Sequence, residues 1–233
     1  ILHLIHGGPH TAFGDAFHYR WNVQAMAAQG YVVACVNFHG SSSFGYAFLD
    51  SITHRWGELE LQDIERATDW LLKKPWADPR RVFASGGSYG GYMVLAALAF
   101  HPELWAAGVD IVGIANFVTF LENTSEYRRQ HRESEYGRLV EDRALLERVS
   151  PINYVERMTA PLLVIHGAND PRVPLSEAEQ LVARLAALGR PAELLVFDDE
   201  GHGVKLLKNK RVAYPAIAHF LDRVLEQSAE RES

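Results

Sequence analysis

Short apolar segments alternate along the chain with longer segments whose apolar positions recur at helical spacing. The short segments are rich in valine, isoleucine, leucine and phenylalanine, and they lack the alternation of a strand with one solvated face. Uninterrupted runs of this kind are typical of parallel strands buried on both faces of a sheet. Strands are therefore expected at 1–5, 31–37, 81–85, 106–112, 161–165 and 192–197.

The longer segments predict helices between these strands. The clearest covers 177–188, where Ser176 and Glu179 fit a capping box at the start and Gly189 follows the last apolar position. Pro215 is expected to kink or restart the last helix. Further helices are expected at 20–29, 59–74, 88–100 and about 209–226.

The regular succession of strand and helix predicts an α/β fold, with a mostly parallel sheet, helices on both faces and right-handed crossovers. A length of 233 residues fits one domain with one core. Segment 114–150 breaks the rhythm, because arginines and glutamates dominate it and aliphatic residues are few. It is expected to form a helical excursion outside the sheet, as a lid or a rim.

Composition narrows the functional classes. The formal net charge is −6 and no segment gathers five or six like charges, which argues against a nucleic-acid or anionic-membrane partner. No apolar run approaches the ~20 residues of a membrane span. The single cysteine, Cys35, excludes an internal disulfide, fits a reducing, cytoplasmic compartment, and is expected to be a small buried hydrophobic residue.

The strongest chemical signal is a serine flanked by glycines. Gly86, Ser88 and Gly90 form the Gly-x-Ser-x-Gly pattern of a nucleophile elbow, between an expected strand and an expected helix. Such a turn strains the serine backbone, presents the hydroxyl at the carboxyl edge of the sheet, and leaves no room for a β-carbon at the glycines. A glycine-rich turn without a chemical role is the plainer interpretation, but the position between strand and helix favours a nucleophile.

Two later strands end in loops that carry the partners such a serine needs. Asp170 follows the strand at 161–165, and His202 lies between glycines after the strand at 192–197. The order Ser88, Asp170, His202 is that of the catalytic triad of α/β-hydrolases. All three follow the carboxyl ends of strands, where open parallel sheets hold their sites. The sequence therefore predicts an α/β-hydrolase fold with this triad.

Neighbouring polar residues have plainer interpretations. Asp198, Asp199 and Glu200 lie too close to His202 in sequence to orient it, and they are expected to shape its loop or its surface charge. His166 is expected to form a structural hydrogen bond. No histidines have a metal-ligand spacing, so neither a metal nor a cofactor is predicted.

A glycine pair follows the first expected strand, in His6-Gly7-Gly8-Pro9. In α/β-hydrolases this loop supplies one backbone N–H to the oxyanion hole, and the residue after the nucleophile supplies the other. The donors here would be Gly8, or Gly7, and Tyr89. A simple tight turn is the alternative.

Together these motifs resemble the catalytic domain of the prolyl oligopeptidase family of serine peptidases, and the Gly-Gly-Ser-Tyr-Gly-Gly motif at 86–91 resembles the acylaminoacyl-peptidase-like branch. The resemblance implies Ser88 as nucleophile, His202 as general base and acid, and Asp170 as the partner that orients the histidine. The resemblance extends over nearly the whole chain. The segments that carry it are 6–10, 37–41, 56–57 with Asp63, 86–93, 169–174 and 199–203.

The resemblance also implies substrate contacts. Arg172 matches an arginine that holds a substrate backbone carbonyl in relatives, with a surface salt bridge as the alternative. Val112, Phe117 and Phe120 lie where relatives build an apolar primary pocket, and core packing explains these residues equally well.

Members of the family usually carry a β-propeller before the hydrolase domain and further hydrolase strands before the His-Gly-Gly-Pro loop. The chain opens at Ile1 inside an expected strand. We therefore expect 1–233 to be a catalytic domain whose native chain extends upstream through N-terminal strands and a propeller. Assembly into a homo-oligomer is left open.

The function implied is a serine peptidase that hydrolyses short peptides or acyl-peptides through an acyl-enzyme, with acylaminoacyl- or dipeptidyl-peptidase specificity. A carboxylesterase for small esters, and an inactive structural fragment of a larger peptidase, are alternatives. A carboxypeptidase is a third, in which arginines bind the substrate carboxylate; the plainer interpretation pairs these arginines with glutamates on a solvated helix. The arginines are Arg128, Arg129 and Arg132, and the glutamates are Glu126, Glu133 and Glu135.

Overall fold

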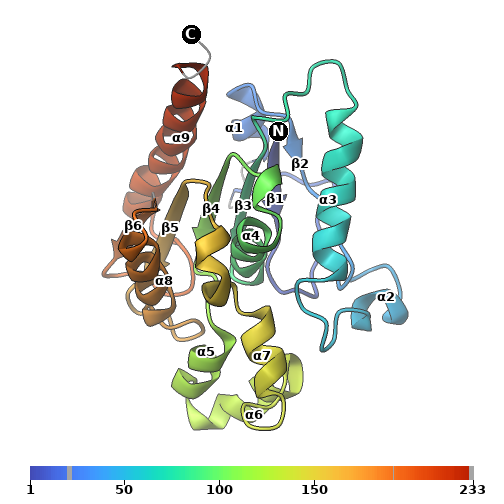
Figure 1. Cartoon of the computed structure of the whole chain (residues 1–233), viewed down its shortest axis with the longest axis vertical. Helices are drawn as coiled ribbons and strands as arrows, with labels where there is room; N and C mark the ends of the chain where they lie inside the picture. Colours follow the sequence, from blue (N-terminus) through green and yellow to red (C-terminus); the bar gives the residue numbers. More distant parts are fainter. Residues whose placement is uncertain (20–22, 191, 231–233) are drawn as a thin grey trace.

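A single parallel sheet organises the structure, a computed structural model that describes residues 1–19, 23–190 and 192–230. Within the described residues the sheet has six strands in the order β2-β1-β3-β4-β5-β6, and every neighbouring pair is parallel (Figure 1). The strands are β1 (Leu2–Ile5), β2 (Val33–Ala34), β3 (Phe83–Gly87), β4 (Ala107–Ile111), β5 (Leu162–Gly167) and β6 (Ala192–Phe197). The expected α/β-hydrolase sheet is confirmed, although the strand expected at 31–37 shortens to two residues at the sheet edge.

Helices cover both faces of the sheet, as expected. One core cluster joins the sheet to α3, α4 and α8, and a second joins it to α1 and α9. A short helix, α2, follows β2 along the chain. These helices are α1 (Val23–Ala28), α2 (Tyr46–Asp50), α3 (Leu59–Leu72), α4 (Tyr89–Phe100), α8 (Ser176–Ala187) and α9 (Leu207–Glu230).

Helix α4 lies at the centre of the molecule. It is apolar on all sides, and every residue from Tyr89 to Ala99 is buried, as is typical of a helix enclosed by protein. It packs against β1, β3 and β4. The turn that connects β3 to α4 is therefore fixed on both sides.

The segment at 114–150 leaves the sheet, as the sequence predicts. It forms α5 (Phe117–Asn123), α6 (Glu126–Tyr136) and α7 (Arg143–Val149) beyond the end of β4 (Figure 1). Two short 3₁₀ helices, η1 (Pro102–Leu104) and η2 (Pro151–Arg157), flank β4 and this excursion along the chain. The excursion is tied to α8 by Glu177, whose buried carboxylate accepts the Asn116 N–H at 2.8 Å.

Two details of the helices differ from expectation. Helix α8 begins at Ser176 with Leu175 at its N-cap, so the expected capping box of Ser176 and Glu179 is wrong; the Glu177 N–H already bonds to Pro174 O in a helical turn. Helix α9 continues through Pro215, so of the expected kink or restart the restart does not occur. Proline inside a helix costs about 3 kcal/mol, and burial of the apolar α9 face against the sheet offsets this cost.

The N-terminal helix and the cysteine differ from expectation in smaller ways. Residues 20–22 of the helix expected at 20–29 lie outside the described residues. Cys35 is half-buried rather than buried. No helix in the described part of the chain combines the length and apolarity needed to cross a membrane.

Candidate active site

Ser88 occupies the turn between β3 and α4 in a strained backbone conformation, with φ 60° and ψ −119°. A β-carbon at Gly86 would lie 2.3 Å from Gly90 O, and one at Gly90 would lie 2.1 Å from Ile5 O. Both approaches are far shorter than a non-bonded contact allows, so the turn requires glycine at these positions, as the sequence predicts. The strain is maintained by the buried elements on either side.

The structure brings the three residues of the expected triad together. His202 Nε2 lies 2.9 Å from Ser88 Oγ, and His202 Nδ1 lies 2.7 Å from Asp170 Oδ2. Because an ionised carboxylate only accepts hydrogen bonds, Nδ1 carries the proton and Nε2 accepts from the serine hydroxyl. This arrangement prepares the histidine to remove the serine proton.

The electrostatics of Asp170 favour the ionised form. Burial alone would raise the pKa of this carboxyl, but the hydrogen bond and charge of His202 and two backbone N–H groups lower its pKa below the usual value. Those N–H groups belong to Arg172 and Val173, at 2.8 and 3.0 Å from Oδ1. Asp170 therefore carries a negative charge at neutral pH.

The neighbouring polar residues hold the two loops. His166 is fully buried, and its Nε2 donates to Val173 O at 3.0 Å, which is the structural hydrogen bond expected of it. Glu200 Oε1 and Asp199 Oδ1 both accept from Asn209 Nδ2, and Asp199 pairs with Lys208. These contacts tie the loop before His202 to α9, so the acidic residues shape the loop as expected.

The His-Gly-Gly-Pro loop packs directly on the serine turn. A β-carbon at Gly7 would lie 3.2 Å from Ser88 Cβ and 2.6 Å from Gly87 O. Gly8 has φ +132°, a conformation that favours glycine. Thr11 Oγ1 donates to Gly7 O at 2.6 Å and so fixes the peptide beside the serine. The predicted donor loop thus lies against the predicted nucleophile.

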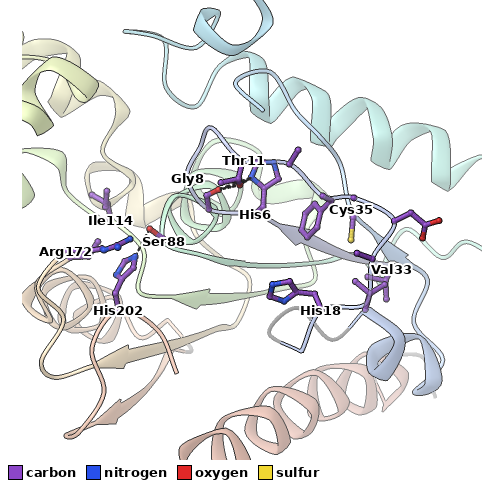
Figure 2. A pocket seen from close by; sticks show the side chains of 18 of the residues that line it. His6, Gly8, Thr11, His18, Val33, Cys35, Ser88, Ile114, Arg172 and His202 are labelled. Carbon is purple, nitrogen blue, oxygen red and sulfur yellow. Dashed lines mark hydrogen bonds between the residues drawn. The ribbon is translucent and has the colours of Figure 1, made fainter. Parts of the chain in front are cut away.

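A cavity of about 680 Å³ opens at Ser88 and His202. Figure 2 shows Ser88, His202, Arg172 and Ile114 gathered at one end, with Cys35 and Val33 at the far end. Burial raises the pKa of the Cys35 thiol to about 11, so the thiol faces the cavity as a neutral group.

The apolar and aromatic residues that line the cavity include Ile114, Phe120, Tyr136 and Val173, and Ile114 lies at the end that holds Ser88. Of the three residues expected in a primary pocket, Phe120 lines the cavity, whereas Val112 and Phe117 are fully buried and are not among its lining residues. Phe117 packs instead between Tyr92 and Tyr136, with ring centroids 4.9 and 5.1 Å away. Sequence reasoning missed Ile114 and Tyr136; the signal for Tyr136 is an aromatic residue at the end of a helix made mostly of charged residues.

The arginines divide into two groups. Arg172 and Arg132 both line the cavity. None of the described carboxylates forms an ion pair with Arg172, so the surface salt bridge that was the alternative role of Arg172 does not form among the described residues. Arg132 Nη1 donates to Glu135 at 2.8 Å, one of the expected pairs. Arg128 and Arg129 donate to backbone carbonyls, at Pro171 and at Glu122, and the side chain of Glu126 lies outside the described part of the chain.

In the part of the chain that the structure describes, no group of three or more histidine, cysteine, aspartate or glutamate side chains is placed to hold a metal ion.

Comparison with known proteins agrees with this geometry. The chain is similar to dipeptidyl aminopeptidase BIII of Pseudoxanthomonas mexicana, with 36% identity over 236 aligned positions. The alignment covers 99% of this chain and 34% of that protein. The fold of this chain is similar to that of Pyrococcus horikoshii acylaminoacyl peptidase, with TM-score 0.80 and 29% identity over 87% of this chain and 33% of that one. It is equally similar to a Mycobacterium tuberculosis puromycin-hydrolyzing peptidase, with TM-score 0.80 and 30% identity over 87% of this chain and 30% of that one.

The chain thus spans about a third of the length of these relatives. The model of the prolyl oligopeptidase family matches residues 17–228, nearly the whole chain. By this match, the chain belongs to the prolyl oligopeptidase family.

Proposed function

We propose that the protein is a serine peptidase that hydrolyses short peptides or acyl-peptides through an acyl-enzyme. The observation that carries this proposal is the continuous line of hydrogen bonds from Asp170 through His202 to Ser88 Oγ. This is the arrangement that converts a serine hydroxyl into a nucleophile.

In the proposed mechanism, His202 Nε2 takes the proton from Ser88 as Oγ attacks the substrate carbonyl carbon. The carbonyl oxygen becomes an oxyanion that accepts hydrogen bonds from the backbone N–H groups of Tyr89 and Gly8. Collapse of the tetrahedral intermediate breaks the C–N bond, and His202 returns the proton to the leaving amine. A water molecule, deprotonated by His202, then hydrolyses the acyl-enzyme and restores the serine.

The walls of the cavity support a preference for an apolar side chain on the acyl residue, since Ile114, Phe120, Tyr136 and Val173 line the same cavity as Ser88. Arg172, beside His202 in Figure 2, is proposed to hold a backbone carbonyl of the substrate. The names of the relatives include both dipeptidyl and acylaminoacyl peptidases, and we propose specificity of one of these two kinds.

One observation favours a second candidate, a carboxypeptidase, because the Arg132 guanidinium reaches the cavity. Guanidinium groups bind carboxylates in a bidentate manner. Glu135 already occupies one edge of this group, so we rank the carboxypeptidase second.

Further proposals concern the rest of the protein. Residues 1–233 are proposed to be the catalytic domain of a longer chain with N-terminal strands and a β-propeller; the relatives, about three times as long, and the two-residue edge strand β2 support this. A cytoplasmic location is proposed from the single cysteine. Assembly into a homo-oligomer stays a prediction.

The test compares turnover of p-nitroanilides of free dipeptides and of N-acyl amino acids with turnover of p-nitrophenyl esters, using wild type and Ser88→Ala. Cleavage of anilides that requires Ser88 is the expected result. Cleavage of esters alone would replace the peptidase by a carboxylesterase. Peptide cleavage that is abolished when the substrate C-terminus is amidated would favour the carboxypeptidase, and no turnover of any substrate would favour an inactive structural fragment.

A further inference from the structure

A carboxylate lies fully buried beneath the proposed active site without a cationic partner. Glu60, on α3, has no exposed surface, and none of the described basic side chains pairs with it. Its Oε1 accepts the Tyr89 hydroxyl at 2.5 Å and the Gly57 N–H at 2.7 Å. Burial raises the pKa of Glu60, and these hydrogen bonds oppose the rise. A buried carboxyl is costly to the fold, so its contacts point to a specific task.

The principal contact of Glu60 is the residue next to the nucleophile. Tyr89 directly follows Ser88, and its backbone N–H is one of the two proposed oxyanion donors. Its ring is buried against Trp56 and Tyr92, at centroid distances of 5.6 and 5.3 Å. The side chain is therefore held at the backbone by α4 and at the hydroxyl by Glu60. A side chain fixed at both ends restricts rotation of the peptide that carries the N–H.

The same aromatic cluster reaches the other donor. Phe38 lies 6.5 Å from the Tyr89 ring and stacks on His6 at 4.3 Å. His6 Nδ1 lies 3.0 Å from both Thr11 Oγ1 and Gly7 O, in the loop that carries Gly8. Figure 2 shows His6, Thr11 and Gly8 side by side at the cavity. Tyr89 is thus packed into a cluster that borders both sides of the proposed oxyanion hole.

We propose that Glu60 is a positioning residue that acts through Tyr89 on the oxyanion hole and so stabilises the transition state more than the bound substrate. The proposal rests on the peptidase mechanism above. It adds to that mechanism a residue of α3 that does not touch the substrate.

The test uses Glu60→Ala, Glu60→Gln and Tyr89→Phe. Loss of one oxyanion donor typically costs ~10²–10³-fold in rate, so a misaligned donor should cost less. Glu60→Ala and Tyr89→Phe are each expected to lower kcat by about 10- to 100-fold with KM within about twofold. The affinity of a peptidyl trifluoromethyl ketone, whose tetrahedral adduct carries the oxyanion, should fall by the same factor. Glu60→Gln keeps an acceptor for Tyr89 and should restore most of the activity.

A product-like peptide inhibitor, which forms no oxyanion, should bind all variants equally. The matched control is Thr68→Ala, which removes another buried polar side chain of α3, one bonded to His3 and Ile64 O. It should lower the melting temperature without changing the ratio of the two inhibitor affinities. In the double variant Glu60→Ala with Tyr89→Phe, the loss should not exceed that of Glu60→Ala alone, because both act through one contact.

Equal weakening of both inhibitors, or unchanged kcat in Tyr89→Phe, would overturn the proposal and leave Glu60 a purely structural residue. If Glu60→Ala does not fold, Tyr89→Phe decides the question, because it removes only one hydroxyl. Failure of the peptidase mechanism itself is distinguishable, because it would appear in proteins with an intact Glu60 and Tyr89: as no anilide cleavage by the wild type, or as undiminished cleavage by Ser88→Ala.

Discussion

His202 Nδ1 and Asp170 Oδ2 lie 2.7 Å apart, although the two residues are 32 positions apart in the chain. Their loops follow adjacent strands, β5 and β6, whose parallel register carries both loops to the same edge of the sheet. The contact fixes the tautomer in which Nε2 is free to accept the Ser88 proton.

Asp170→Asn is expected to lower kcat by about 10³- to 10⁴-fold, because an amide can hold the histidine in the wrong tautomer. KM should change little, since Asp170 does not face the cavity. Steady-state kinetics measure both values. Asp198→Asn, in an exposed position of the neighbouring loop, is the matched control and should retain wild-type kcat. Retention of activity in Asp170→Asn would remove the aspartate from the mechanism.

The close approaches at the serine turn predict an intolerance of side chains. Gly90→Ala places a methyl group 2.1 Å from Ile5 O, so α4 or β1 must shift. The expected cost is at least about 2 kcal/mol, or roughly 5 °C in melting temperature for a chain of this size. Gly14→Ala is the control, because a β-carbon there meets no atom within 4 Å. Calorimetry of the two variants checks this, and equal melting temperatures would contradict the packing described here.

Asp110 makes stability depend on pH. Burial raises the pKa of this carboxyl from 3.8 to about 7, and its hydrogen bond from the Gly113 N–H opposes the rise. The folded state therefore retains a proton that the unfolded state has lost, so this contribution is complete below about pH 4 and disappears as the pH rises through 7. At ~1.4 kcal/mol for each pKa unit, the loss is about 4 kcal/mol at most.

Asp110→Asn should consequently show a flatter dependence of unfolding free energy on pH between about 4 and 8 than the wild type. Urea unfolding at several pH values provides the measurement. The difference between the two proteins isolates Asp110 from Glu177, whose pKa burial also raises to about 7. Parallel curves for wild type and variant would show that Asp110 does not titrate in this range.

Arg172→Ala tests the proposed substrate contact. Hydrogen bonds to charged groups contribute about 1.5–3 kcal/mol, so KM should rise by roughly tenfold or more while kcat falls less. Arg184→Ala, an exposed arginine of α8 near Glu156, is the control and should leave KM unchanged. An effect on kcat alone would place Arg172 outside substrate binding.

Apolar patterns explain why the sheet was predictable from the sequence. The strands β1, β3, β4 and β5 are buried on both faces, so each appears in the sequence as a short apolar run. A glycine lies at or just after the end of each of these strands and marks the turn that follows. The strand β2 was overestimated because an edge position leaves its apolar residues half-buried and unpaired on one side. The triad could be predicted because it depends on local turns at strand ends.

The buried polar residues that support the site could not be predicted, because their partners lie far away in the sequence. Glu60 and Thr68 are polar residues of the amphipathic helix α3, yet both are fully buried. Their partners, Tyr89 and His3, come from distant segments. The sequence offers Arg132 as a candidate for carboxylate binding, but no local pattern shows that an arginine of the excursion lines the cavity.

Covalent labelling tests the central claim most directly. The wild-type protein incubated with a fluorophosphonate should gain the mass of one phosphonyl group, and peptide mapping should place the group on Ser88. The Ser88→Ala protein should gain none, and His202→Ala should react far more slowly. Undiminished labelling of Ser88→Ala, or no labelling of the folded wild type, would contradict the assignment of Ser88 as the nucleophile.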